Sequence, residues 1–203
     1  EDVCESHGAT HKGQRLGSFG WMSNFSFYYA HHMSTIEGGM VCTNDDALYE
    51  QVRVLRAHGM VRESMSDSFK HQYKADNPAL NPDFIFAYPA YNMRNTEIGG
   101  ILGRSQLKRL DANNALRTRN MLRFLDQINP NAFRTDFEVE GSSNYAFNLV
   151  LREPDFERTE RVMEHMRRHR IEFRRGSAGG GNQIRQPYLR GIVLTNHHLA
   201  FPE

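Results

Sequence analysis

The sequence predicts an α/β chain that contains the end of an α/β domain, a long connecting helix and a small, incomplete C-terminal α+β domain. Three observations predict this order. Strand-like segments followed by an amphipathic helix occupy residues 17–59, apolar residues recur at a 3–4 spacing over 95–128, and a strand–helix–strand pattern follows. We therefore expect three parts, at residues 1–94, 95–128 and 129–203.

The first part begins with strands. GSFGWMSNFSFYYA at 17–30 alternates small and aromatic residues, and GGMVCT at 38–43 is a short apolar run, so both indicate strands. TNDDALYEQVRVLRAHG at 43–59 then has the signature of a helix. Its start can be capped by Thr43 or Asn44, whose side chains accept hydrogen bonds from free backbone amides.

Residues 61–92 are polar and are interrupted by prolines, which predicts an extended loop. A helix over 95–128 follows. Beyond it, SSNYAFNLVL at 142–151 is typical of a strand, DFERTERVMEHMRRHR at 155–170 of a helix, and IEFRR at 171–175 of a second strand.

Composition excludes several classes of function. The net charge is +1 and basic residues form no stripe, so we expect no nucleic-acid partner. No run of eighteen apolar residues exists, so we expect no membrane span. Cys4 and Cys42 are too few for a disulfide framework, which favours a reducing, cytoplasmic location. The chain starts EDVCESHG without Met, so we expect a piece of a longer protein.

His31 and His32 are the most conspicuous titratable pair. Adjacent residues on a strand face opposite sides, so these two histidines could not ligate one metal ion there, and no partner stands at ligand spacing. We expect no metal site. A single histidine is more often structural, although its ordinary pKa makes it eligible as a general base.

Several motifs occur in a fixed order and together are far more specific than any one of them: Asp2, HGA at 7–9, KG at 12–13, GSFG at 17–20, FSFYYAHHMSTIEGGMVCTND at 25–45, LRAHG at 55–59 and YNMRNTEIGGILGRSQLKRLD at 91–111. This series resembles the pyridoxal-phosphate-dependent DegT/DnrJ/EryC1/StrS sugar aminotransferase family. The resemblance implies the type I aspartate aminotransferase fold and covers essentially the whole chain.

The resemblance implies four cofactor-binding residues. Asp2 would pair with the pyridine nitrogen and so keep the ring able to accept electrons. Ser26 would bind the cofactor phosphate, and Glu5 occupies a position where the aminotransferases usually have glutamine. Asn92 would reach the phosphate in the partner subunit, which implies a homodimer with shared active sites.

One position departs from the aminotransferase pattern. Five residues after the serine, the aminotransferases carry the Schiff-base lysine, and this sequence has His31. Pyridoxal phosphate would therefore be held without a covalent link, while His31 could still move a proton. This replacement marks the family's sugar 3-dehydratases and implies the lyase reaction, with L-glutamate converting the cofactor to pyridoxamine phosphate. The C3 hydroxyl of GDP-4-keto-6-deoxymannose is then lost, for deoxysugar (colitose-type) and O-antigen synthesis.

The remaining candidates are less specific. His58 could act on the leaving hydroxyl or could simply stabilise a helix end. Four arginines could hold the diphosphate or the glutamate carboxylate, or could belong to surface turns: Arg62, Arg174, Arg175 and Arg185. An iron–sulfur relative is excluded because its cluster needs four thiolates. Two alternatives stay open: a nucleotide-sugar aminotransferase that uses another lysine, and a non-catalytic relative.

Overall fold

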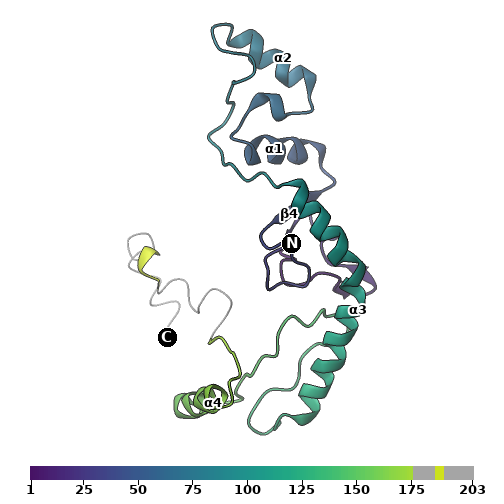
Figure 1. The fold of residues 1–203 in the computed structure, drawn as a ribbon, viewed down its shortest axis with the longest axis vertical. Coiled ribbons are helices and arrows are strands. Elements are labelled where there is room, and N and C mark those ends of the chain that lie inside the picture. The colour runs from purple at the N-terminus through teal and green to yellow at the C-terminus, as the bar shows by residue number, and fades with distance from the viewer. Residues whose placement is uncertain (176–185, 190–203) are drawn as a thin grey trace. The chain divides into compact units, whose positions relative to one another are not determined.

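The computed structural model describes residues 1–175 and 186–189. The chain divides into two units, Glu1–Val150 and Leu151–Glu203. The first unit contains two short β-hairpins and the helices α1, α2 and α3, and the second contains α4 (Figure 1). The three-part division expected from the sequence differs from these two units in its boundaries and stays a proposal.

The strands of the first unit form two separate antiparallel pairs. β1 (Thr10–His11) pairs with β2 (Gln14–Arg15), and β3 (Met22–Ser26) pairs with β4 (Gly39–Thr43). Both strand predictions in this region are thereby confirmed.

The first residues of the chain run alongside β3. Asp2 forms an isolated parallel bridge with Asn24. On either side of it, the Val3 amide donates to the Asn24 carbonyl over 2.9 Å, and the Asn24 amide donates to the Glu1 carbonyl over 3.0 Å. This pairing places the acidic start of the chain within reach of the residues that follow β3.

Helix α1 (Asp46–Arg56) confirms the predicted helix but corrects its cap. The cap is Asp45, whose Oδ1 accepts a 2.9 Å hydrogen bond from the Leu48 amide, and not Thr43 or Asn44. Thr43 is still paired in β4, and its Oγ1 accepts a hydrogen bond from the Asp45 amide instead. Only Asn44 separates the end of the strand from the cap of the helix.

The chain turns sharply after α1. His58 and Gly59 both have left-handed backbone angles, with φ of 62° and 74°. A Cβ atom at Gly59 would lie 2.1 Å from the Tyr88 carbonyl oxygen, so only glycine fits there. The segment that returns past this turn is held by a 2.7 Å hydrogen bond from the His58 amide to the Tyr91 carbonyl.

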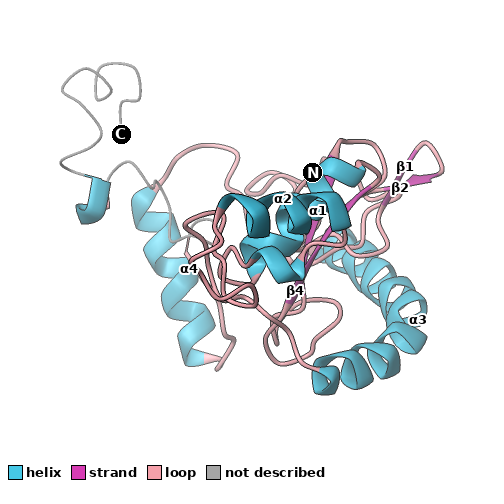
Figure 2. Cartoon of the chain, turned by 90° about the horizontal axis from the view of Figure 1, so that it is seen from above, coloured by secondary structure: helices cyan, strands magenta, loops and turns pink. Residues whose placement is uncertain are grey.

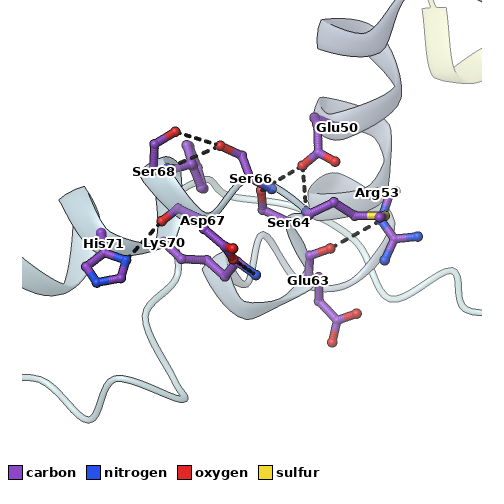
Figure 3. A network of polar contacts seen from close by, with 11 residues as sticks. Glu50, Arg53, Glu63, Ser64, Ser66, Asp67, Ser68, Lys70 and His71 are labelled. Atoms are coloured by element: carbon purple, nitrogen blue, oxygen red, sulfur yellow. Dashed lines mark hydrogen bonds and ion pairs between the residues drawn. The ribbon is translucent and has the colours of Figure 1, made fainter.

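The predicted loop over 61–92 is wrong for its first half, which contains the short helix η1 (Val61–Glu63) and helix α2 (Asp67–Asp76). A polar network joins α1 to the segment between η1 and α2 (Figure 3). Glu50 accepts hydrogen bonds from the Ser64 hydroxyl (2.6 Å) and the Met65 amide (2.9 Å). The Ser66 hydroxyl caps α2 by accepting from the Phe69 amide. The start of α2 is therefore marked by a capping serine and not by the apolar periodicity from which helices are usually predicted.

Helix α3 (Glu97–Gln127) confirms the long predicted helix and is the longest element of the chain (Figure 2). Its Leu110 packs with Phe27 and Met33 in the buried core, and Phe25 lies against this cluster. The core therefore joins α3 to the end of β3 and to the segment that carries the two adjacent histidines.

The second unit contains α4 (Phe156–Arg168), where the sequence predicts a helix, and the short helix η3 (Pro187–Leu189). Asp155 caps α4 by accepting from the Arg158 amide over 2.8 Å. The strands predicted at 142–151 and 171–175 are not among the strands of the described residues. A β-strand is completed only by a hydrogen-bonded neighbour, and the described chain pairs neither segment in a ladder. No described helix is long and apolar enough to cross a membrane.

Candidate active site

The acidic start of the chain carries a carboxylate that its neighbours keep ionised. Asp2 Oδ1 accepts hydrogen bonds from the Cys4 amide (3.1 Å) and from the Asn24 side-chain amide (3.2 Å). The pKa of Asp2 lies below its ordinary value because the Cys4 thiol, the Cys4 amide and Asn24 all donate to the charged carboxylate. Asp2 is therefore a fixed negative charge beside β3.

Cys4 lies against the same carboxylate and stays a neutral thiol. Burial, followed by the hydrogen bond to Asp2 and the negative charge of Asp2, raises the pKa of Cys4 to about 11. The Asn24 side chain donates to the Cys4 sulfur over 3.2 Å. The three side chains form one small polar cluster at the parallel bridge.

Ser26 stands at the end of β3, two residues beyond the position that pairs with Asp2. It lies opposite Gly39 in the hairpin, and its Oγ accepts a 3.3 Å hydrogen bond from the Tyr28 amide. The chain then turns, and the His31 amide donates to the Tyr28 carbonyl over 3.0 Å. This turn brings His31 back toward the chain start.

His31 has a largely buried side chain, 12% exposed, and its Nε2 lies 3.8 Å from Oε1 of Glu5. That separation is an ion-pair distance and is too long for a hydrogen bond. Its Nδ1 atom is buried and has no hydrogen-bond partner among the described residues. The structure therefore brings two of the predicted site residues, Glu5 and His31, face to face.

Two further histidines lie beside His31. The His32 ring is buried, its Nε2 donates to the Ser143 carbonyl over 3.1 Å, and burial lowers its pKa. His7 is 4% exposed, and neither ring nitrogen has a hydrogen-bond partner in the described chain. Burial, followed by repulsion from His32 and His31, lowers the pKa of His7 to about 4. Both rings are consequently neutral at pH 7.

The histidines are packed among aromatic rings and are not arranged as metal ligands. The His7 ring centroid lies 5.6 Å from Phe25, 5.8 Å from Phe27 and 5.9 Å from His32. The described residues contain no group of three or more histidines, cysteines and carboxylates that could hold a metal ion. His7 and His32 therefore pack against each other and against aromatic rings.

Tyr145 lies against this cluster from a segment more than a hundred positions away. Its ring centroid is 5.6 Å from His31 and 5.8 Å from His32. The sequence did not predict a role for it, because SSNYAFNLVL reads as a strand and no local pattern links it to the histidines. His7 had a signal, since its HGA motif was recognised, but it was not proposed as a site residue.

One face of α3 holds both of these segments. Asn114 Nδ2 donates to the His7 carbonyl over 2.8 Å, and Arg117 Nη1 donates to the Tyr145 carbonyl over 3.0 Å. Thr118 Oγ1 accepts a 2.9 Å hydrogen bond from the side-chain amide of Asn144. Positions 114, 117 and 118 share a helix face because residues three and four apart lie side by side.

The other candidates of the first unit lie at separate places. His58 is half-buried at the turn after α1, and Asn92 is exposed and pairs with Ala57 in an isolated bridge. Arg62 is exposed, with its guanidinium 5.0 Å from the Phe84 ring centroid and its Nη1 donating to the Asp83 carbonyl. Within the described residues, no hydrogen bond, ion pair or ring contact joins these three to His31.

Two candidate arginines of the second unit, Arg174 and Arg175, are exposed. Arg175 forms an ion pair with Glu160 at 3.0 Å, and Arg174 precedes it on the surface. Arg185 lies outside the described residues.

Comparison with known proteins gives a consistent family. Residues 1–176 match the DegT/DnrJ/EryC1/StrS aminotransferase family. The chain is 32% identical over 175 residues to GDP-4-keto-6-deoxy-D-mannose 3-dehydratase of Escherichia coli O55:H7, covering 86% of this chain and 45% of that protein. It is 36% identical over 119 residues to GDP-perosamine synthase of Caulobacter vibrioides, covering 59% of this chain and 27% of that protein.

Solved structures resemble the chain at a similar level. The E. coli GDP-4-keto-6-deoxy-D-mannose-3-dehydratase with bound hydrated PLP matches with a TM-score of 0.71 and 31% identity, over 85% of this chain and 44% of that one. The same kind of dehydratase with a trapped PLP-glutamate geminal diamine matches with a TM-score of 0.69 and 30% identity, over 83% of this chain and 44% of that one. The chain thus spans less than half the length of these relatives and has part of their type I fold.

Proposed function

Because the chain belongs to the DegT/DnrJ/EryC1/StrS aminotransferase family, we propose that it is part of a pyridoxal-phosphate-dependent hydro-lyase. Its reaction is the removal of the C3 hydroxyl of GDP-4-keto-6-deoxy-D-mannose, with L-glutamate as the amino donor. The similarity to two proteins named as 3-dehydratases of this sugar supports the proposal.

The observation that carries the proposal is that His31, and not a lysine, occupies this position and faces the carboxylate of Glu5. None of the four lysines is in the segment between β3 and β4 that carries His31: Lys12 is in the β1–β2 turn, Lys70 and Lys74 are on α2, and Lys108 is on α3. An imidazole does not form a stable imine with an aldehyde. The arrangement therefore favours proton transfer over a covalent link between protein and cofactor.

The residues beside β3 fit the cofactor. The Asp2 carboxylate is held ionised by three donors, as pairing with a protonated pyridine nitrogen requires. Ser26, at the end of the adjacent strand, offers a hydroxyl for the phosphate. When bound, pyridoxal or pyridoxamine phosphate supplies an electron sink for the substrate carbons.

His31 would take up and hold the proton that the reaction releases. Its Nε2 lies 3.8 Å from Oε1 of Glu5, so we propose Nε2 as the ring atom that exchanges the proton. General base assistance of this kind typically contributes about 10²–10⁴-fold in rate. The neutral rings of His7 and His32 add no competing positive charge near neutral pH.

The remaining roles complete the proposal. His58 acts on the leaving hydroxyl, Asn92 reaches the cofactor phosphate of the partner in a homodimer, and Arg62, Arg174, Arg175 and Arg185 bind the diphosphate or glutamate. Asn92 and Arg62 are exposed, which leaves them accessible to such partners. The enzyme would act in the cytoplasm, in deoxysugar synthesis.

The test uses the full-length enzyme that contains this chain, incubated with pyridoxal phosphate, L-glutamate and GDP-4-keto-6-deoxymannose. We expect ammonia, 2-oxoglutarate and a 3-deoxy ketosugar. Borohydride reduction should leave no cofactor on the protein by mass spectrometry. The His31→Asn variant should lose about 10²-fold or more in rate, and His71→Asn, at an exposed histidine of α2, serves as the matched control.

The second candidate, a nucleotide-sugar aminotransferase, is favoured by the similarity to GDP-perosamine synthase. It predicts a 4-amino sugar as the product and reduced cofactor attached to one of the lysines. Either result would overturn the dehydratase proposal. Failure to bind the cofactor or to consume any ketosugar would instead indicate a non-catalytic relative.

A further inference from the structure

We infer that Tyr145 is a positioning residue for His31. Together with Tyr28, its ring would hold the imidazole in the orientation that directs Nε2 toward Glu5. The inference rests on the proposed role of His31 as a base, and it adds a residue that the sequence motifs do not mark.

The geometry around the imidazole is that of a ring held edge-to-face by two others. The Tyr28 centroid lies 5.5 Å from that of His31 with an interplanar angle of 73°, and the Tyr145 centroid lies at 5.6 Å with 82°. Aromatic pairs favour such distances and near-perpendicular angles. Each contact restricts rotation of the imidazole about its side-chain torsions.

The aromatic contacts replace a hydrogen bond that catalytic histidines commonly use. The orientation of a functional imidazole is usually set by a hydrogen bond from its second ring nitrogen to a carbonyl or carboxylate. Here Nδ1 of His31 is buried without such a partner in the described chain, while Nε2 faces Glu5. Packing against the rings of Tyr28 and Tyr145 would therefore fix the plane of the imidazole in place of that hydrogen bond.

Tyr145 is itself held in place from α3. The Arg117 guanidinium donates to its carbonyl over 3.0 Å, and the neighbouring Asn144 side chain donates to Thr118. On its other side, the Ser143 carbonyl accepts from His32. Three successive residues are thus anchored, so the tyrosine ring can act as a fixed support and not as a loose surface side chain.

The experiment measures the environment of His31 directly, in the full-length protein without substrate. The rate of His31 acylation by diethyl pyrocarbonate is followed by peptide mass spectrometry, and its ring signals are followed by NMR through a pH titration. In Tyr145→Leu we expect acylation to speed up about two- to tenfold, the range expected for loss of one aromatic pair. Tyr145→Phe keeps the ring and should restore the wild-type rate.

Phe147→Leu is the matched control, because Phe147 is an aromatic of the same segment that packs against Phe124. It should leave His31 acylation unchanged. Tyr145→Met, which removes the ring while keeping much of the volume, gives the same comparison if the leucine variant unfolds. An unchanged rate in both Tyr145→Leu and Tyr145→Met, no rescue by phenylalanine, or an equal effect of Phe147→Leu would overturn the inference.

Turnover separates this inference from the proposed function. If His31 is the base and Tyr145 positions it, Tyr145→Leu lowers kcat in parallel with the faster acylation of His31, while KM changes little. If the enzyme transfers an amino group instead, the proposed function fails, yet the acylation and NMR results still decide whether Tyr145 holds the ring.

Discussion

The side-chain amide of Asn114 donates a 2.8 Å hydrogen bond to the main-chain carbonyl of His7, although 107 positions separate the two residues. The contact is close enough that a Cβ atom at Gly8 would lie 2.6 Å from Asn114 Nδ2. It ties α3 to the turn that follows Glu5. The positions of Glu5 and the buried His7 thus depend on a residue of a distant helix.

Asn114→Ala should therefore lower the free energy of unfolding by about 1–3 kcal/mol, because a partly buried carbonyl loses its donor. Urea unfolding followed by circular dichroism measures the change. Asn113→Ala removes the adjacent, exposed asparagine of the same helix and should stay within about 0.5 kcal/mol of wild type. Equal effects of the two substitutions would contradict the importance of this hydrogen bond.

The buried His7 should make the free energy of unfolding decrease at acidic pH. Its pKa is about 4 in the folded chain against a reference value of 6.5, so below pH 6.5 the unfolded chain takes up the proton first. Stability should be unaffected by this group above pH 6.5, fall as the pH drops from 6.5 toward 4, and then level off. Unfolding by urea at a series of pH values measures this slope.

The His7→Met variant provides the comparison for that slope, because methionine fills similar space among Phe25 and Phe27 without titrating. Its stability should fall less steeply between pH 6.5 and 4, with the lowered pKa of His32 accounting for part of the remaining slope. If His7→Met and wild type lose stability in parallel, burial of His7 is not the cause.

Cys4 should react slowly with alkylating reagents. Its pKa of about 11 lies roughly two units above the ordinary value, so the reactive thiolate is scarce at pH 8. Asp2→Asn removes the neighbouring negative charge and should accelerate alkylation by iodoacetamide several-fold. The pKa of Cys4 should stay above its ordinary value, because burial is the larger cause of the shift. Cys42 in the same molecule is the internal control, and an equal change at both cysteines would argue against the Asp2–Cys4 contact.

Gly59→Ala should be severely destabilising. The new Cβ would meet the Tyr88 carbonyl at 2.1 Å with φ at +74°, and strain and overpacking together should cost about 2–4 kcal/mol. Gly13→Ala is the matched control, since Gly13 has φ of +80° with nothing within 4 Å. It should cost only the backbone strain, about 1–2 kcal/mol. Thermal unfolding of both variants gives the difference.

The elements that sequence reasoning located were those with local signals. Helix α1 has acidic residues at its start and a glycine after its end, and α3 has a long apolar periodicity. Helix α2 was not predicted because Phe69 and Tyr73 are its only large apolar residues, and its start depends on Ser66 as a cap. A serine in a polar stretch predicts a loop as readily as a helix start.

The residues of the candidate site also fall into those that the sequence suggested and those that it did not. Glu5 and His31 lie together because the chain start pairs with β3, a long-range contact that only the family resemblance could suggest. Tyr145 could not be predicted, since its ring contact joins segments 114 positions apart and is set by α3. Polar residues on a helix face indicate exposure, and Asn114 and Arg117 looked like ordinary solvent-facing positions.

The shared face of α3 has a consequence for changes in chain length. A single residue inserted in α3 ahead of Asn114 would turn positions 114, 117 and 118 by about 100° around the helix axis. The hydrogen bonds to His7 and to Tyr145 would then be lost together, even though no residue of the histidine cluster had changed. An insertion of seven residues would nearly restore the rotation but would shift the face by about 10 Å along the axis. The number of residues in this helix, as much as their identity, therefore decides whether the two segments around His31 meet.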